Sequence, residues 1–410
     1  MTRIKRTPTI LLALLLLLPA TAGAQKAFRD IRAQLKAKKS ADALKAVEKL
    51  EKDSTLRLDP RLYDFGVQAY VQQNEAENEK IYLQQKADTA KLFQTALGIY
   101  RYILRCDTAE TYVLETKHKQ RKFRKPHALL VHTYYNNLCA GGRWYYAKRD
   151  YKQALQYLLP VLDVPYHPVW TATKNAPVPE RYTESAVLAV RSAFLTGDTA
   201  TVVRFAAEAL KDTSAARRLI LENVAQTAKL RGDTIDWLAY LEEGLEQYPE
   251  VPYFFTDFTD YYTRREDYAA SLRLADRMLR TDSVNFLFLT AKSLALINLG
   301  RDREAIEAAK LCLLADSTNA DTYYYIGAGY CNLASSVGIP SNFNSPDYKK
   351  AITERRNYYL LARPYLERYR ELQPDERRRW APLLYSIYLA LNQGPQFEEI
   401  QHIMKEIYAK

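Results

Sequence analysis

Glycine and proline are scarce in this chain. Its 410 residues include 13 Gly and 17 Pro, whereas Ala, Leu, Lys, Arg, Glu and Gln are abundant. Most of these abundant residues are strong helix formers, and glycine and proline disfavour the interior of a helix. The composition therefore favours helix throughout the chain and argues against a sheet.

Cysteine is also rare, with four residues at positions 106, 139, 312 and 331. The chain is thus not one of the small secreted scaffolds that depend on many disulfides. Cys312 and Cys331 are expected late in two antiparallel helices, about 10 Å apart along the axis, which is too far for a disulfide. Buried free thiols are the expectation. Spacing does not decide whether Cys106 and Cys139 pair.

Catalytic motifs are missing. The sequence has no Gly-x-x-x-x-Gly-Lys phosphate loop, no Gly-x-Gly-x-x-Gly and no Gly-x-Ser-x-Gly elbow. Of its five histidines, His127 and His132 are five residues apart and so do not share a helix face as paired metal ligands would. No cysteine pair has metal-binding spacing. We therefore expect no enzyme activity, no metal and no cofactor.

Long apolar runs are absent except near the start of the chain. Three basic residues precede an apolar run at 10–18, and Ala22-Gly23-Ala24 follows it. This order is typical of a cleaved secretory signal peptide. The run is shorter than the roughly 20 residues that span a membrane. Residues 1–24 are thus a predicted signal peptide. We expect export to the periplasm or outside the cell, with a mature chain that starts at Gln25 and does not span the membrane.

The formal net charge is +11, but acids and bases alternate almost everywhere. A nucleic-acid surface would be concentrated, and an exported protein has little access to nucleic acid, so we expect no nucleic-acid partner. One concentrated block exists at 117–125. It is either a contact for an anionic surface or a solvated loop between helices, since blocks of like charge are commonly disordered. Its cations are Lys117, Lys119, Arg121, Lys122, Arg124 and Lys125.

The sequence repeats itself at a spacing of 34 residues. Asp282-Ser283-x-Asn285 returns as Asp316-Ser317-x-Asn319, and repeat units that start at 218, 252, 286 and 320 stay in step. The unit that starts at 320 contains Tyr323-x-x-Ile326-Gly327-x-x-Tyr330, which fits the first helix of a pair. Its glycine would allow the two helices to approach closely. This period and pattern are those of the tetratricopeptide repeat (TPR).

The chain thus resembles the TPR family over residues 183–392 and more loosely over 26–163. It is also similar to a group of exported bacterial TPR proteins that end in a block like the one from Trp380 to Asn392; this resemblance implies no activity. The predicted fold is an all-α TPR-like solenoid, a right-handed superhelix of antiparallel helix pairs. After the signal peptide we expect diverged N-terminal repeats with insertions (25–180), a TPR array (181–374) and a C-terminal capping helix pair (375–410).

The resemblance implies that first helices line a concave groove that binds a protein or peptide partner. The predicted function is therefore a non-catalytic interaction scaffold of the bacterial envelope, in which Asp260, Arg264 and Tyr324 contribute most. The 32 tyrosines leave an alternative open, a carbohydrate-binding helical-repeat protein. The groove residues are Asn223, Gln226 and Lys229 in one unit, Asp257, Asp260 and Arg264 in the next, and then Asn298, Tyr324, Tyr325 and Asn332.

Overall fold

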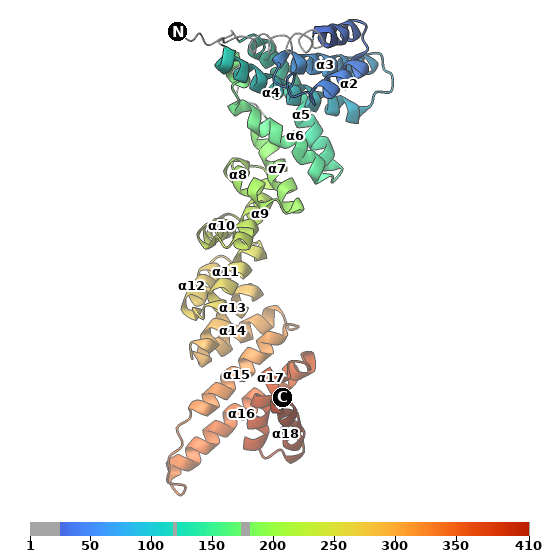
Figure 1. Ribbon diagram of the computed structural model, residues 1–410. Coiled ribbons are helices and arrows are strands. Elements are labelled where there is room, and N and C mark those ends of the chain that lie inside the picture. The colour runs from blue at the N-terminus through green and yellow to red at the C-terminus, as the bar shows by residue number, and fades with distance from the viewer. Residues whose placement is uncertain (1–24, 118–120, 174–180, 410) are drawn as a thin grey trace, which may run out of the picture. The chain divides into compact units, whose positions relative to one another are not determined.

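The structure is a computed structural model that describes residues 25–117, 121–173 and 181–409 (Figure 1). These residues fall into two compact units that divide between Trp237 and Leu238, and each unit is considered by itself below. Every regular element in the described ranges is helical. The predicted signal peptide lies outside the described residues.

The first unit is a succession of helices in which each packs against the next. Residues 25–36 are helical. The following elements are α2 (Ser40–Leu50), α3 (Pro60–Tyr82), α4 (Thr89–Lys117), α5 (Arg124–Ala147), α6 (Tyr151–Asp163), the 3-10 turns η1 (Val164–Tyr166) and η2 (Trp170–Ala172), α7 (Tyr182–Thr196), α8 (Thr199–Ala209) and α9 (Ala216–Arg231). The next helix, α10 (Thr234–Gln247), contains the point at which the two units divide.

Short turns join the helices of a pair, and their sequence explains them. Gly197 ends α7 with φ +77°, a left-handed conformation that glycine adopts without a steric penalty. The next residue, Asp198, accepts a hydrogen bond from the backbone N–H of Thr201 and so caps α8. Gly232 ends α9 in the same way, with φ +74°. Gly197-Asp198-Thr199 and Gly232-Asp233-Thr234 have the same three residues, and both form helix-ending turns.

The second unit confirms the predicted repeat. Its first helices α11, α13 and α15 begin at Pro252, Phe286 and Ala320, in steps of 34 residues, as predicted. In the first unit, α9 begins at Ala216, two residues before the predicted start. The elements of the second unit after α10 are α11 (Pro252–Arg264), α12 (Tyr268–Leu279), α13 (Phe286–Asn298), α14 (Asp302–Ala315), α15 (Ala320–Ser336), α16 (Pro346–Leu372), α17 (Arg377–Ala390) and α18 (Gly394–Tyr408).

The predicted close approach occurs at Gly327. A Cβ atom added to this residue would lie 2.4 Å from Cγ of Leu366, which is fully buried on α16. Only a hydrogen atom fits in that space. The backbone of α15 at Gly327 therefore packs directly against the Leu366 side chain of α16, as the repeat pattern requires.

Three first helices of the second unit are neighbours of one another. Here α13 contacts α15, and α15 contacts α17, whereas α12, α14 and α16 make no comparable contacts with one another. That the first helices line a concave, partner-binding groove stays a prediction. The handedness of the superhelix and the four-part division of the chain remain predictions.

Two segments of the first unit that the repeat pattern treats as insertions, about 74–88 and 107–125, lengthen helices in their described parts. Residues 74–82 continue α3, and residues 107–117 continue α4, so that these helices have 23 and 29 residues. In the second unit the pattern treats residues 335–346 as a further insertion, and α16 begins at the last of them, Pro346, and has 27 residues. The pair formed by α15 and α16 therefore extends well beyond the other pairs of this unit (Figure 1).

A buried carboxylate fixes the connection between α3 and α4. The Glu77 side chain is 1% exposed, and its Oε1 accepts hydrogen bonds from Nζ of Lys80 at 2.9 Å and of Lys91 at 2.8 Å. Its Oε2 accepts from the backbone N–H of Asp88 at 3.2 Å. Hydrogen bonds from the Lys91 and Lys80 ammonium groups, then from Asp88 N–H, lower the pKa of Glu77 to about 2.

This lowered pKa predicts a pH-dependent stability. The stabilisation by ionised Glu77 is complete above the unfolded pKa of 4.5 and is lost as the pH falls towards 2. Without screening, the lowered pKa would add about 3 kcal/mol to the free energy of unfolding. Solvent screening of the half-exposed lysines reduces this contribution to about 1–2 kcal/mol. Glu77→Gln should therefore destabilise the chain near neutral pH and much less at about pH 3, in urea titrations at both pH values. The exposed Glu48→Gln should show no such difference; equal losses at both pH values would contradict this role.

Candidate partner-binding surfaces

The predicted groove residues of α11 lie at the surface. Asp260 and Arg264 are exposed, and Asp257 is half-buried. Because Asp260 and Arg264 are four residues apart, they lie on the same face of the helix. Neither forms an ion pair with another described residue, so both charges are available to a partner. Asp257 is engaged in an interaction within the chain.

The predicted residues of α13 and α15 differ in their surroundings. Asn298 is exposed, and its Nδ2 donates to the carbonyl oxygen of Leu294 at 2.8 Å. Asn332 Nδ2 donates to Oδ1 of Asp302 at 2.8 Å and thereby ties α15 to α14. Tyr325 is 5% exposed and packs in the core. Of these residues, Asn298 is the one whose side chain is mostly open to solvent.

Tyr324 belongs to a structural cluster between α15 and α17. The guanidinium of Arg379 lies 4.1 Å from its ring centroid and 5.3 Å from that of buried Tyr369. The same arginine donates from Nη1 to Oδ1 of Asp321 at 2.7 Å. The Tyr324 ring thus supports an arginine that joins two first helices. We expect its loss to reduce stability, in contrast to the sequence-based expectation of a contact residue.

In the first unit, α9 carries the other three predicted residues. Asn223 is 8% exposed, Gln226 is exposed, and Lys229 is half-buried with its ammonium 5.0 Å from the Trp237 ring centroid. Burial leaves Asn223 and Tyr325 without surface for a partner, so neither is a candidate contact residue. The physical reason is that a first helix packs on its own partner and also on neighbouring pairs, which widens its buried stripe.

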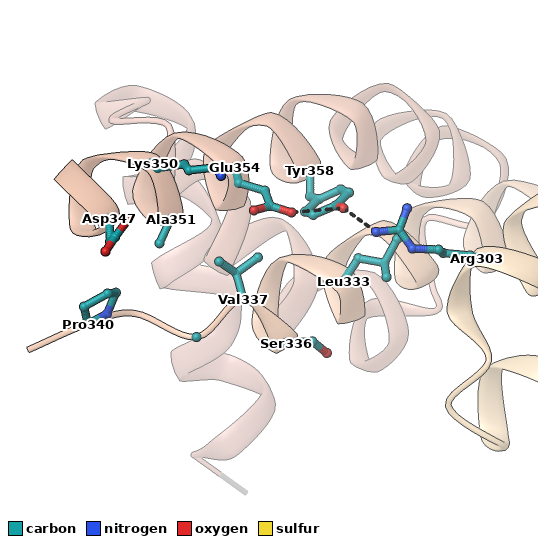
Figure 2. A pocket seen from close by; sticks show the side chains of 11 residues that line it. Arg303, Leu333, Ser336, Val337, Pro340, Asp347, Lys350, Ala351, Glu354 and Tyr358 are labelled. Carbon is teal, nitrogen blue, oxygen red and sulfur yellow. Dashed lines mark hydrogen bonds between the residues drawn. The ribbon is translucent and has the colours of Figure 1, made fainter.

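A cavity at the end of the α15–α16 pair where the two helices are joined was not predicted from the sequence. It measures about 360 Å³ and lies between α14, α15, α16 and the connection 337–345 (Figure 2). Arg303 Nη2 donates to the Tyr358 hydroxyl at 3.0 Å, and that hydroxyl donates to Oε1 of Glu354 at 3.4 Å. The repeat pattern does not account for the first half of α16. The sequence nevertheless contains a signal for its start, because Ser345 caps the helix and Pro346 is its first residue.

The basic stretch is partly neutralised within the chain. Arg124 donates from Nε and Nη2 to the two carboxylate oxygens of Asp107 at 2.6 and 2.7 Å, and Arg121 lies 3.5 Å from the same carboxylate. Asp107 is 5% exposed. Lys122 and Lys125 remain exposed, whereas Lys119 and the Lys117 side chain lie outside the described residues. The stretch therefore offers fewer free charges to an anionic surface than its sequence suggests.

Two acids of α4 hold the start of α5. Besides the Asp107 pair, Oε1 of Glu110 accepts hydrogen bonds from the backbone N–H of Lys122 and, at 2.9 Å, of Phe123. Glu110 is 3% exposed. Residues 121–124 are therefore anchored on α4, which is not the expected state of a freely solvated loop.

The four cysteines and His127 are buried in the first and second units. All four cysteines are free and buried, as expected. Burial raises the pKa of the Cys106 thiol, which disfavours the reactive thiolate. His127 is buried, and its Nε2 lies 2.9 Å from Oδ1 of Asp64. Within the described ranges, no group of three or more His, Cys, Asp or Glu residues is placed to hold a metal ion. The absence of catalysis stays a prediction.

Many of the paired tyrosines pack inside the units. Tyr145 stacks on buried Tyr157 with ring centroids 5.2 Å apart, and Tyr262 stacks on Phe258 at the same distance. The most exposed large aromatic side chains, Tyr82, Tyr166, Phe343 and Tyr408, lie on separate elements. This arrangement favours packing over a shared aromatic platform, so no observation specifically favours the carbohydrate-binding alternative.

Comparisons with known proteins give no close relative. No protein-family profile matches the chain, and no curated protein matches it. Similar solved structures include MamA AMB-1 (TM-score 0.33, 17% identity, 48% of this chain and 94% of that one). The P58(IPK) TPR domain has a TM-score of 0.26 at 12% identity over 90% of this chain and 98% of that one. Yeast Tom70 has a TM-score of 0.30 at 12% identity over 88% of this chain and 84% of that one.

The chain's own helices define its class: an all-α array of TPR-type antiparallel helix pairs with a 34-residue step in the second unit. In the described part of the chain, no helix is both long and apolar enough to cross a membrane.

Proposed function

We propose that this chain is a scaffold of the bacterial envelope that binds a protein partner through the first helices of its second unit, without catalysing a reaction. The observation that supports this proposal is the pair Asp260 and Arg264. Both side chains are exposed on a first helix, share one face and form no ion pair with a described residue. Charged groups on the concave side of a repeat array can recognise an extended peptide or a helix. The signal-peptide pattern supports the envelope location.

Three further observations define the proposed surface. Asn298 on α13 is exposed and continues the polar surface of the first helices. Tyr324 and Asn332 contact neighbouring helices, so they would support the surface by holding the helices in place and would not touch the partner. The cavity of Figure 2 lies between α14, α15 and α16 and gives the same unit a second concave feature.

The test is affinity capture of a partner from envelope extracts, followed by titration with the purified partner. Asp260→Ala/Arg264→Ala should weaken binding at least tenfold, which corresponds to about 1.4 kcal/mol. The melting temperature should hardly change, because both side chains are exposed and unpaired. Tyr324 is left intact because its ring supports Arg379.

The matched control is Glu246→Ala/Arg273→Ala, which removes one exposed acid and one exposed base from the second helices α10 and α12. This control should bind like the original chain. Full binding by the Asp260/Arg264 variant, together with loss of binding in Lys122→Ala/Lys125→Ala, would place the site on the basic stretch instead.

A further inference from the structure

The end of α3 and the residues that join it to α4 (81–88, called the α3–α4 connection below) expose three consecutive large apolar side chains. Ile81 is 52% exposed, Tyr82 is 86% exposed, and Leu83 is 53% exposed. Lys80 precedes them and Lys86 follows them. Single exposed apolar residues are ordinary, but a contiguous group commonly marks a contact with a partner or a membrane.

A basic cavity lies at the same connection. It measures about 450 Å³, and its lining includes Lys80, Lys86, Trp144 and Lys148. The Lys148 ammonium is 3.6 Å from the Trp144 ring centroid. Lys86 and Lys148 form no ion pair with the residues that the structure describes, so both charges are free to meet an anion.

The local charge balance is positive. Besides Lys86 and Lys148, Lys80 and Lys91 lie beside the connection, both bound to Glu77. The other acids are the exposed Glu79 and Asp88, whose Oδ1 accepts from the backbone N–H of Lys91. The four lysines and three acids leave a net charge of +1 at one end of the α3–α4 pair.

The exposed residues are held on a rigid support. Glu77 binds Lys80 and the backbone of Asp88, which lie at the two ends of the connection. Gln84 ends the helix with φ +56°, and Gln85 N–H donates to the carbonyl oxygen of Lys80 at 2.8 Å. Because the backbone is fixed in this way, it would lose little conformational freedom on docking.

We propose that the α3–α4 connection docks on an anionic lipid surface. Tyr82 and its two apolar neighbours enter the interfacial region, and Lys86 and Lys148 bind headgroup phosphates at the mouth of the cavity. Tyrosine and tryptophan favour the membrane interface, and nearby lysines add an attraction to anionic lipids. The three apolar side chains lie at the end of α3 and do not line the cavity, which suits a lipid surface better than a partner helix. This surface is separate from the one proposed on the second unit.

The test is sedimentation of the mature chain, from Gln25, with vesicles. One set is phosphatidylcholine alone, and the other has equal parts of phosphatidylcholine and phosphatidylglycerol. The chain should bind the anionic vesicles, and added salt should weaken this binding. Lys86→Gln/Lys148→Gln should weaken it roughly tenfold or more, since each lysine near the surface contributes about fivefold. Tyr82→Ser/Leu83→Ser should weaken it through the loss of apolar burial.

The matched control is Lys45→Gln/Lys49→Gln, which removes two exposed lysines from α2 and should leave binding unchanged. Equal binding to both vesicle types, or equal loss in the control and in the Lys86/Lys148 variant, would overturn the proposal. It would also fail if inorganic phosphate at matched ionic strength displaced the chain while Tyr82→Ser/Leu83→Ser bound normally, since that would indicate a small-anion site. None of these outcomes depends on the partner surface of the second unit.

Discussion

Gly327→Val is expected to destabilise the α15–α16 pair by about 3 kcal/mol, a typical cost of strong overpacking in a core. The added Cβ would lie 2.4 Å from Cγ and 2.9 Å from Cδ2 of Leu366. Leu366 is fully buried beside Tyr369 and Trp380, so it cannot turn away without disturbing its neighbours. Urea denaturation gives the overall effect, and hydrogen exchange of the α15 and α16 amides should show the local loss of protection.

The chain provides a matched control for this substitution. Gly338 has no atom within 4 Å of an added Cβ and lies in the exposed connection after α15. Gly338→Val should change the unfolding free energy by no more than about 0.5 kcal/mol. In the background of Leu366→Ala, which alone should cost about 2–5 kcal/mol, Gly327→Val should cost much less than in the original chain. Additive effects would contradict the proposed contact.

The repeat could be predicted because its constraint is local in the sequence. A helix pair with a fixed turn returns after a fixed number of residues, so the starts at 252, 286 and 320 follow from the pattern. Gly327 could also be predicted, because the repeat needs one small residue where two helices approach most closely. These features require no knowledge of distant contacts.

The exposure of the candidate contact residues was harder to predict, because it depends on packing between helix pairs. Asn223 and Tyr325 stand beside packing positions in the pattern, yet both are buried, since a first helix is covered from more than one side. Tyr324 stacks under Arg379, which lies 55 positions later in the chain. No spacing rule within one repeat contains that contact. A single sequence therefore predicts the repeat fold better than it predicts which residues of the first helices are exposed.

The basic stretch shows the same limit. Its lysines and arginines form a block of one sign, and the sequence alone allows either an anionic contact or a solvated loop. The acids that bind it, Asp107 and Glu110, lie on α4, and Asp107 is 17 positions before Arg124. The pairing follows from the antiparallel packing of α4 and α5, which charge patterning does not specify.

Asp107→Ala is expected to destabilise the first unit by about 3–5 kcal/mol, because it leaves the partly buried Arg124 without its partner. The Arg124 side chain is 20% exposed, so water replaces the lost carboxylate only in part. Asp107→Leu/Arg124→Leu should recover much of the loss, since it removes both charges together. Thermal and urea denaturation of the three chains would measure these differences.

The exposed pair Asp163 and Arg204 is the natural control, since it joins the same two residue types with side chains that are 41% and 59% exposed. Asp163→Ala should cost no more than about 1 kcal/mol. A similarly small cost for Asp107→Ala would mean that the buried acids do not hold the basic stretch. In that case Arg121 and Arg124 would be available to an anionic surface, and the stretch at 117–125 would compete with the α3–α4 connection as the docking site.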